Sequence, residues 1–394
     1  METRLVGVQD LDREDLEAWN VLAERAVEPN PFFEPGFLVL AARHFDGFAG
    51  TRLLIATEGS EWRAMLAVIG VGRPRIPPRR CGTTSGVPTA MSGLSTPLVD
   101  REHVDEATAA LLDGLQREAK AGRLPGILSL NRVDEHGPVV AALRQACAIR
   151  AMPVFTKETW MRGMVTRTGH WEQPLSRQRL KENARRRRML ARDSGLELSV
   201  ADRTHDPAAP EEFLKLEASG WKGRGHGTAF ARDQAKIAWF HEWVDHWTQT
   251  GRVTLLALNI GDTSIAFRIL LRAGEGLWLF RTAYDDNYAK YGPGSLLLES
   301  ALATQFEQTE ASWLDSNTDP DNSFLLEMLP ERRTISMVLI GTGGTVDRRV
   351  ISTMPMISRG VNEVRRIRFG LKRLRHRDSA SAGSQAPGAS VSNA

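Results

Sequence analysis

The sequence predicts an α/β protein with mixed sheets, built as two successive units that are joined by a basic helix. With 394 residues the chain is too long for one ordinary core, so two domains and a tail are expected. Strand-like apolar runs alternate with helical stretches in both halves, and the arginine-rich stretch SRQRLKENARRRRMLARDSG separates the halves. The expected parts are an N-terminal domain (1–167), a basic linker helix (168–195), a second domain (196–345), a basic segment (346–378) and a disordered tail (379–394).

The first unit is predicted to mix strands and helices around an irregular segment. This segment, RPRIPPRRCGTTSGVPTAMSGLSTPLVD, is too rich in Pro, Gly, Ser and Thr for regular structure. The elements expected before it are a strand (3–8), a helix (13–26), a helix after the NPFFEPGF turn, and two strands (51–57 and 62–71). Those expected after it are a helix (103–121), a strand (126–131) and a helix (138–148).

The second unit has a clearer order of elements. Three consecutive strands are the centre of this pattern, and a Gly261-Asp262 turn joins the first two. The expected order is a strand (196–200), two helices (210–221 and 233–250), strands (253–259, 264–272 and 277–284), a helix (295–309), a strand (312–315), a short helix (323–329) and a strand (334–340). The sequence GTGGT after the last strand is predicted to be a hairpin turn into another extended run.

The composition is that of an ordinary globular enzyme, with 42% hydrophobic and 25% charged residues. Two cysteines, Cys81 and Cys147, are too few for a disulfide framework, which favours a reducing compartment. The first fifteen residues lack the apolar core of a signal peptide, and no run approaches the roughly 18 apolar residues that span a bilayer. We therefore expect a cytoplasmic protein.

The most informative segment is the loop YAKYGPGS between the third strand and the next helix. Gly292 and Gly294 let the backbone approach a ligand closely, and the helix that opens at Ser295 presents unpaired amides and a positive dipole end. This arrangement suits a pyrophosphate. An ordinary strand-to-helix turn would use the same glycines.

Three segments of the sequence resemble the GNAT superfamily, in its CelD-like branch related to FemAB peptidyltransferases. These segments are LEASGWKGRGHGTAF, IAFRILL and YDDNYAKYGPGSLL. The likeness covers about residues 160–341, and it departs from the GNAT phosphate motif where Ala289 occupies the usual basic or Gln position beside Lys290. The resemblance implies tandem GNAT-like domains, the first of them degenerate, and transfer of an acyl group from an acyl-CoA such as acetyl-CoA to an unidentified amine. The residues that it implies for cofactor binding are Phe280, Thr282, Lys290, Tyr291, Gly292, Pro293, Gly294 and Ser295.

Acyl transfer from a thioester needs a proton acceptor and an oxyanion site more than it needs a nucleophile on the protein. Carboxylates at the ends of neighbouring strands make Asp315 and Asp285 the candidate bases. The alternative for Asp315 is a helix N-cap or turn residue in its Asn/Asp/Pro-rich loop. Tyr284 and Tyr291 are the candidate acids, since Phe324 occupies the place where a tyrosine is usual.

The glycine-rich stretch after the first helix of the second unit is assigned to the acceptor. Trp221, Lys222 and His226 lie there, although Trp221 can also anchor a helix end and His226 can be a solvated loop residue. No metal site is expected. His241 and His246 are five residues apart, which places them about 140° apart around a helix.

The two basic segments leave alternative functions open. The cluster 185–188 is either a solvated interdomain helix or a tRNA contact, the latter implying FemAB-like transfer from aminoacyl-tRNA. In 361–377 apolar residues recur every three or four positions among cations, the pattern of a helix on an anionic membrane. The third hypothesis is a non-catalytic GNAT scaffold that this segment recruits to a polysaccharide or envelope assembly at the inner membrane face.

Overall fold

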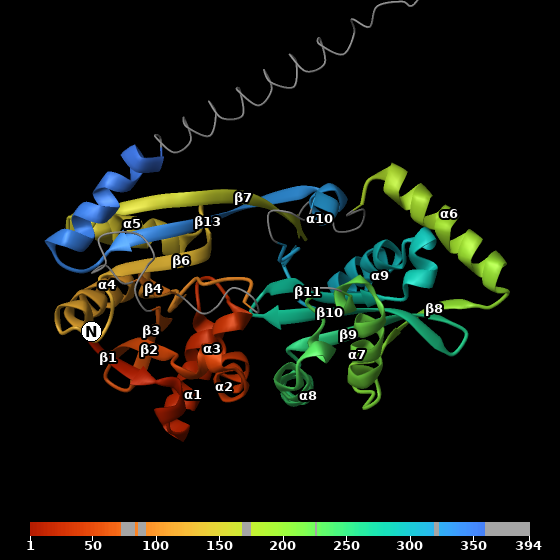
Figure 1. The fold of residues 1–394 in the computed structure, drawn as a ribbon, viewed down its shortest axis with the longest axis horizontal. Helices are drawn as coiled ribbons and strands as arrows, with labels where there is room; N and C mark the ends of the chain where they lie inside the picture. The colour runs from red at the N-terminus through yellow and green to blue at the C-terminus, as the bar shows by residue number, and fades with distance from the viewer. Residues whose placement is uncertain (72–82, 86–91, 168–174, 225–226, 319–322, 359–394) are drawn as a thin grey trace, which may run out of the picture.

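The computed structural model of the chain describes residues 1–71, 83–85, 92–167, 175–224, 227–318 and 323–358 (Figure 1). The first half contains β1 (Glu2–Gly7), α1 (Arg13–Arg25), α2 (Pro35–His44), α3 (Asp46–Ala49), β2 (Arg52–Glu58), β3 (Glu61–Val71), β4 (Thr83–Ser85), β5 (Leu98–Val99), α4 (Val104–Lys120), β6 (Ile127–Asp134), α5 (Pro138–Ile149) and β7 (Val154–Thr166). Helix α6 (Arg177–Ser194) follows. The second half contains β8 (Leu198–Asp202), α7 (Ala209–Ser219), α8 (Gln234–Gln249), β9 (Val253–Ile260), β10 (Thr263–Ala273), β11 (Gly276–Tyr284), α9 (Pro293–Gln308), β12 (Trp313–Asp315), α10 (Ser323–Met328) and β13 (Glu331–Gly341).

The described strands form one continuous mixed sheet that passes through both halves. Its order is β1-β2-β3-β4-β6-β13-β7-β12-β11-β10-β9-β8, with β5 paired to β3. The last strand of the second half, β13, lies between β6 and β7 of the first half, and β7 in turn pairs with β12 of the second half. Each half therefore completes its sheet with a strand from the other.

The predicted elements agree with the observed ones to within a few residues, and the α/β fold with two similar halves is confirmed. Strand β7 was not predicted, because VFTKETWMRGMVT mixes charged residues and Gly163 into its apolar pattern. Gly163 lies where α10 approaches the strand, since a Cβ there would be 2.6 Å from the main-chain oxygen of Leu325. In the segment predicted to be irregular, β4 and β5 are short strands.

The hairpin predicted at GTGGT is wrong, because residues 345–358 are helical. The Asp347 side chain accepts a hydrogen bond from the Gly344 amide at 3.1 Å and so satisfies a donor that a helix start would otherwise leave unpaired. The segment 361–377 and the tail lie outside the described residues. No helix among the described residues is long and apolar enough to cross a membrane.

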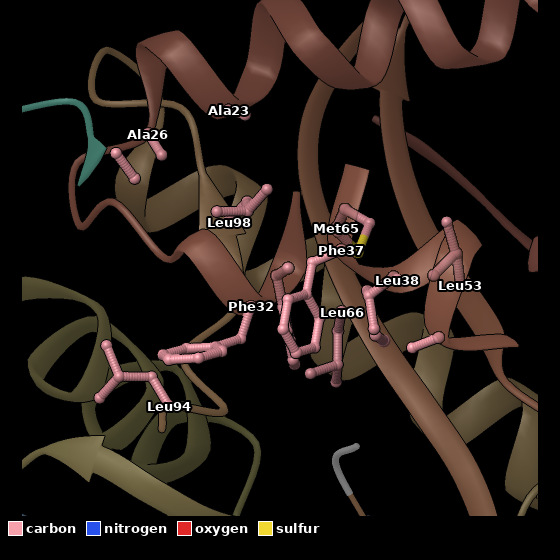
Figure 2. Close-up of a cluster of buried hydrophobic side chains, with 14 of the residues drawn as sticks. Ala23, Ala26, Phe32, Phe37, Leu38, Leu53, Met65, Leu66, Leu94 and Leu98 are labelled. Atoms are coloured by element: carbon pink, nitrogen blue, oxygen red, sulfur yellow. The ribbon is translucent and has the colours of Figure 1, made fainter. Parts of the chain in front are cut away.

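Apolar side chains of both halves join in a shared core. Figure 2 shows Phe32 and Phe37 packed among leucines of the first half. Phe37 also meets the edge of Trp239 on α8, with ring centroids 5.6 Å apart. In the second half α7 and α8 cover one face of β9–β11 and α9 covers the other (Figure 1).

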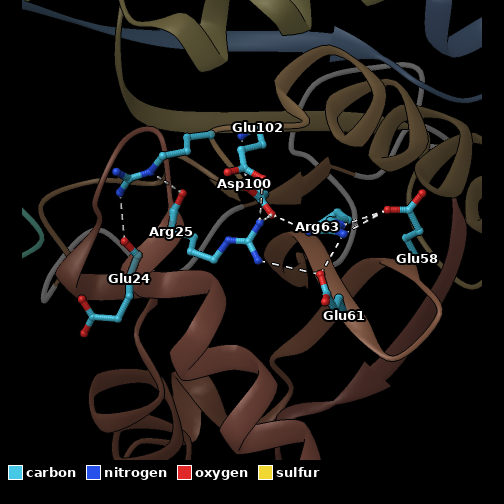
Figure 3. Close-up of polar contacts among 8 residues, drawn as sticks. Glu24, Arg25, Glu58, Glu61, Arg63, Asp100 and Glu102 are labelled. Atoms are coloured by element: carbon cyan, nitrogen blue, oxygen red, sulfur yellow. Dashed lines mark hydrogen bonds and ion pairs between the residues drawn. The ribbon is translucent and has the colours of Figure 1, made fainter.

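A buried carboxylate organises the polar side of the first half (Figure 3). Asp100 pairs with Arg25 at 2.8 Å and with Arg63 at 2.9 Å. Burial alone would raise the pKa of Asp100, but the Glu102 amide, the Arg63 hydrogen bond and the charge of Arg25 together hold that pKa below its ordinary value. This cluster joins α1 to β3, so it is structural.

Candidate functional site

The sheet of the second half opens between two parallel strands. The register of β11 with β12 covers Gly276 to Trp278 and ends there, at Asp315. Strand β11 continues to Tyr284 on its other edge, paired with β10. The backbone of β11 beyond Trp278 therefore faces the opening.

A β-bulge lies in the open part of β11. Ile269 of β10 is opposite Arg281 and Leu270 is opposite Leu279, which leaves Phe280 as the extra residue on β11. Bulges re-aim side chains and interrupt the regular use of backbone amides. The ring of Phe280 packs against Trp243 at 5.2 Å between centroids, so the aromatic core anchors the bulge.

The predicted phosphate loop lies at the end of β11. A short 3-10 helix, η5 (Asp286–Tyr291), ends at Gly292, whose φ of 60° is left-handed, and α9 begins at Pro293. Among the described residues, a Cβ added at Gly294 would meet only the Cγ2 atom of Thr282, at an ordinary contact distance of 3.8 Å. Open space therefore adjoins the first turn of α9, as an anion seat requires.

Helix α6 packs across this loop. The hydroxyl of Ser295 donates to Oδ1 of Asn183 at 2.8 Å, and Arg187 pairs with Glu299 at 2.9 Å. A Cβ at Gly292 would be 2.5 Å from Nη1 of Arg186, so this guanidinium lies directly beside the loop. The basic helix is thus part of the site's wall and not only a solvated linker.

Two residues predicted to bind the cofactor form side-chain hydrogen bonds with α6. Tyr291 is buried, and its hydroxyl donates to Asp193 at 2.8 Å. The Ser295 hydroxyl is taken up by Asn183, as described above. Lys290 is exposed, and its Nζ lies 4.7 Å from the Tyr291 ring centroid. The hydroxyl protons of Tyr291 and Ser295 are therefore donated within the protein, and the Ser295 amide also donates to the main-chain oxygen of Gly292 at 2.9 Å. Lys290 can offer a ligand its charge.

Cationic side chains lie beside β10 and β11 next to the opening. Arg268 is buried and donates to the main-chain oxygen of Gly294 at 2.9 Å. Lys222, from η3 (Trp221–Gly223), donates to the main-chain oxygen of Thr282 at 2.7 Å. Burial lowers the pKa of Arg268 to about 10 and that of Lys222 to about 8. Both charges thus lie in a poorly hydrated environment.

One buried carboxylate faces this cluster. Glu217 of α7 pairs with Arg281 at 3.1 Å and with Lys222 at 3.8 Å, and it accepts the Phe230 amide at 2.8 Å. The guanidinium of Arg281 also lies over the ring of Phe230, 3.9 Å from the centroid. Sequence reasoning missed Arg268, Arg281 and Glu217. The signal was a single charge inside each of the apolar runs IAFRILL and WLFRTAY, and the pair Lys215 and Glu217 inside FLKLEAS.

Asp315 does not have the surroundings of a general base. It is fully buried, pairs with Arg333 at 3.0 Å and with Arg162 at 4.0 Å, and accepts the Asn317 amide at 2.6 Å. The turn role that the sequence left open is the one observed. Asp285 is only partly buried, at the carboxyl end of β11 next to Tyr284, and accepts the Asn287 amide at 2.9 Å.

Of the predicted acceptor residues, the structure brings Lys222 to the site, whereas His226 lies outside the described residues. Trp221 begins η3 in the same segment. Among the described residues no group of His, Cys, Asp or Glu side chains is suited to a metal ion. A cavity of about 980 Å³ lies elsewhere, between α2 of the first half and α8, lined by residues that include Glu34 and Trp247.

Comparison with known proteins identifies this part of the chain. Residues 177–321 match a family model described as an acetyltransferase (GNAT) domain. This chain carries a GNAT domain. The match begins at α6 and includes β11 and the Gly292 loop, so the domain contains the site. The predicted GNAT resemblance is confirmed. No curated protein matches the sequence.

Solved structures extend the likeness to most of the chain. FemX is 11% identical with a TM-score of 0.57, covering 86% of this chain and 97% of FemX. A conserved protein of unknown function from Bacteroides thetaiotaomicron is 10% identical with a TM-score of 0.54, covering 84% and 98%. The C-terminal domain of a putative lysylphosphatidylglycerol synthetase from Agrobacterium fabrum is 11% identical with a TM-score of 0.52, covering 87% and 96%. At these identities the likeness shows a shared fold, which includes both halves.

Proposed function

We propose that the chain is an N-acyltransferase that moves an acyl group from an acyl-CoA, with acetyl-CoA the simplest donor, to an amine. One observation carries the proposal. Strand β11 leaves β12 after Trp278, and the open edge leads to the accessible first turn of α9 at Gly294. The extended arm of a CoA thioester fits an open strand edge, and its pyrophosphate fits a helix amino end.

We assign the binding of the acyl-CoA donor mainly to backbone groups of β11 and of the Gly292 to Ser295 turn, which together form the proposed donor seat. We assign the amide of Gly294 to the pyrophosphate, because Pro293 has no N–H and the amides of Gly292 and Ser295 donate to the main-chain oxygens of Ala289 and Gly292. The exposed Lys290 adds a positive charge. The open edge at Phe280 and Thr282 takes the thioester arm. Arg268 stabilises this seat, because its side chain donates a hydrogen bond to the main-chain oxygen of Gly294 at 2.9 Å.

The reaction needs little covalent help from the protein. The amine nitrogen attacks the thioester carbonyl carbon, the carbon–sulfur bond breaks, and the proton released by the amine ends on the thiolate sulfur or in solvent. We assign Asp285 to accept that proton and Tyr284 to protonate the thiolate, because both lie at the carboxyl end of β11 and are partly exposed. The β11 bulge is assigned to the oxyanion.

A second candidate donor is an aminoacyl-tRNA. The observation that favours it is the row of arginines that α6 carries past the loop, with Arg186 beside Gly292 and Arg185 largely exposed. The fold shared with FemX is compatible with this donor. The acyl-CoA proposal is preferred because the open strand edge and the Gly294 turn supply the seat that a thioester cofactor needs.

The proposal is tested by measuring the melting temperature of the protein in the presence of acetyl-CoA, free CoA or an aminoacyl-tRNA. Acetyl-CoA at 100 times its dissociation constant is expected to stabilise the fold by roughly 2.7 kcal/mol. Stabilisation by tRNA alone, with affinity that falls steeply with salt, would replace acyl-CoA by aminoacyl-tRNA as the donor. A chain that binds neither donor would be a non-catalytic scaffold.

A further inference from the structure

The cavity of about 980 Å³ between the two halves is a candidate for a second ligand site. Helices α1 and α2 of the first half bound it on one side, and α8 with the turns at Gly251 and Gly274 bounds it on the other (Figure 1). None of Phe280, Thr282 and Gly294 is among its lining residues. Cavities that bind small molecules have volumes of about 300–1,000 Å³. This cavity is therefore large enough for a ligand and is separate from the proposed donor seat.

The buried carboxyl group of Glu34 lines this cavity. Glu34 immediately precedes α2, and its side chain is 8% exposed. It accepts no hydrogen bond from the described residues, and its ion pair with Nε of Arg252 is long, at 3.5 Å. Arg252 also pairs with Glu24, so one guanidinium serves two carboxylates. Because a buried charge is stable only when it is well paired, a second cation beside Glu34 would stabilise its charged form.

The pKa of Glu34 reflects this weak pairing. Burial raises the pKa of Glu34 to about 8, and the charge of Glu24 acts in the same direction, while the charge of Arg252 opposes them. Without a bound cation, Glu34 is therefore protonated at neutral pH. An ammonium group bound beside Glu34 would lower this pKa and release the proton.

Two hydrogen-bond donors lie at the same end of α2 as Glu34. The side chain of Trp247 is buried and lines the cavity, and its Nε1 atom donates to none of the described residues. A Cβ added at Gly36 would be 2.5 Å from this atom, so the indole nitrogen lies against the first turn of α2. Gly36 is the second residue of α2, where a helix leaves its amide without an intrahelical partner. Both N–H groups suit an oxygen atom of a ligand.

Aliphatic side chains form another part of the cavity wall. Leu16 of α1 and Val39 and Leu40 of α2 line the cavity together with the polar groups. Covering such side chains removes apolar surface from water and favours binding. A ligand with a carbon skeleton next to its polar groups therefore fits this wall.

We propose that the cavity binds an amino alcohol with an aliphatic body. Its ammonium group pairs with Glu34, and its hydroxyl oxygen accepts hydrogen bonds from Nε1 of Trp247 and the amide of Gly36. Its aliphatic body covers Leu16 and Val39. An anion fits less well, because the carboxylate of Glu34 would repel it. This inference does not depend on the proposed acyltransferase function, since the site shares no lining residue with the donor seat.

Calorimetric titration of the full chain, without an acyl donor, tests the proposal. The probes are leucinol, the matching amine without the hydroxyl group, and the matching alcohol without the amino group. We expect leucinol to bind at least tenfold more tightly than either of the other probes. The proposal is overturned if no probe binds, or if the amine or the alcohol binds as tightly as leucinol does.

Binding should also depend on pH through Glu34. Since the ammonium group pairs with the ionised carboxylate, the affinity for leucinol should rise up to pH 8, with release of up to one proton per ligand. Titrations in buffers of different ionisation enthalpy measure this release. The other charged or titratable groups that line the cavity are Glu24, Arg43, Glu242, Asp245, His246, Arg252 and Arg272. A proton release that stays the same in Glu34→Gln would come from one of these groups and would contradict the role of Glu34.

Two variants assign the binding to the cavity. Glu34→Gln should raise the dissociation constant of leucinol at least tenfold at pH 8, while Glu17→Gln, at an exposed position of α1, is the matched control and should not change it. Trp247→Phe should weaken the binding of leucinol and leave that of the amine without the hydroxyl group unchanged. Unchanged binding of leucinol by a folded Glu34→Gln would overturn the proposal. If Glu34→Gln does not fold, the comparison of the three probes on the wild-type protein still decides.

Discussion

The hydroxyl of Ser295 donates a hydrogen bond to Oδ1 of Asn183 at 2.8 Å and joins the first turn of α9 to the basic helix α6. The amide of Asn183 continues this contact, because its Nδ2 atom donates to Glu299 at 2.6 Å. Asn183 is fully buried, as is Leu190 on the same helix. Helix α6 is thus anchored on the wall of the proposed donor seat.

Replacing Asn183 by Ala should destabilise the protein, because the change leaves a buried Ser295 hydroxyl without its acceptor. The expected loss is about 1–3 kcal/mol of unfolding free energy, measured by urea denaturation. Lys181→Ala, on an exposed position of the same helix, should cost less than about 0.5 kcal/mol. Equal losses in both variants would contradict the anchoring role of Asn183.

Asp315→Asn tests whether this residue is structural. The change removes a buried negative charge from Arg333, and breaking such a pair costs about 3–5 kcal/mol. We expect a large loss of unfolding free energy, while the pH dependence of kcat in the remaining folded enzyme keeps its shape. A stable variant whose acidic pH limb of kcat disappears would instead make Asp315 the base, because a base acts only when it is deprotonated.

Glu34 should make stability depend on pH. Burial raises its pKa from 4.5 to about 8, against the opposing charge of Arg252. Between these two pH values the unfolded chain gives up a proton that the folded chain keeps, so rising pH destabilises the fold by up to about 1.4 kcal/mol per pH unit. Glu34→Gln removes this effect, so its stability relative to wild type should increase from pH 5 to pH 8 and then level off. Urea denaturation across this range checks the trend, and a difference independent of pH would contradict it.

Local patterns explain why most elements could be predicted. Alternating apolar residues, the Gly261 turn and the glycines before α9 each act over a few residues. The exchange of β7 and β13 could not be predicted, because partners such as Ile335 and Trp160 lie far apart in sequence. The helix at 345–358 was missed because VDRRVIS carries β-branched residues that favour strands, while tertiary contacts and the Asp347 cap favour a helix.

The candidate site was only partly predictable for a similar reason. The Gly292 loop depends on backbone geometry that glycines reveal. The role of Asp315 depends on Arg333, and the burial of Arg268 depends on α9, which come from other parts of the chain. A charged residue within an apolar strand is the one local sign of such sites.

Titration of acetyl-CoA into Gly294→Val by calorimetry tests the central claim most directly. The described part of the chain has room for this side chain, since a Cβ at Gly294 meets only Thr282 there, at 3.8 Å. The added methyl groups would occupy the proposed donor seat. Gly47→Val, at an open position in the first half, is the matched control. We predict that Gly294→Val weakens acetyl-CoA binding at least tenfold with its fold intact, while Gly47→Val binds as wild type does. Unchanged binding by a folded Gly294→Val would contradict the donor seat.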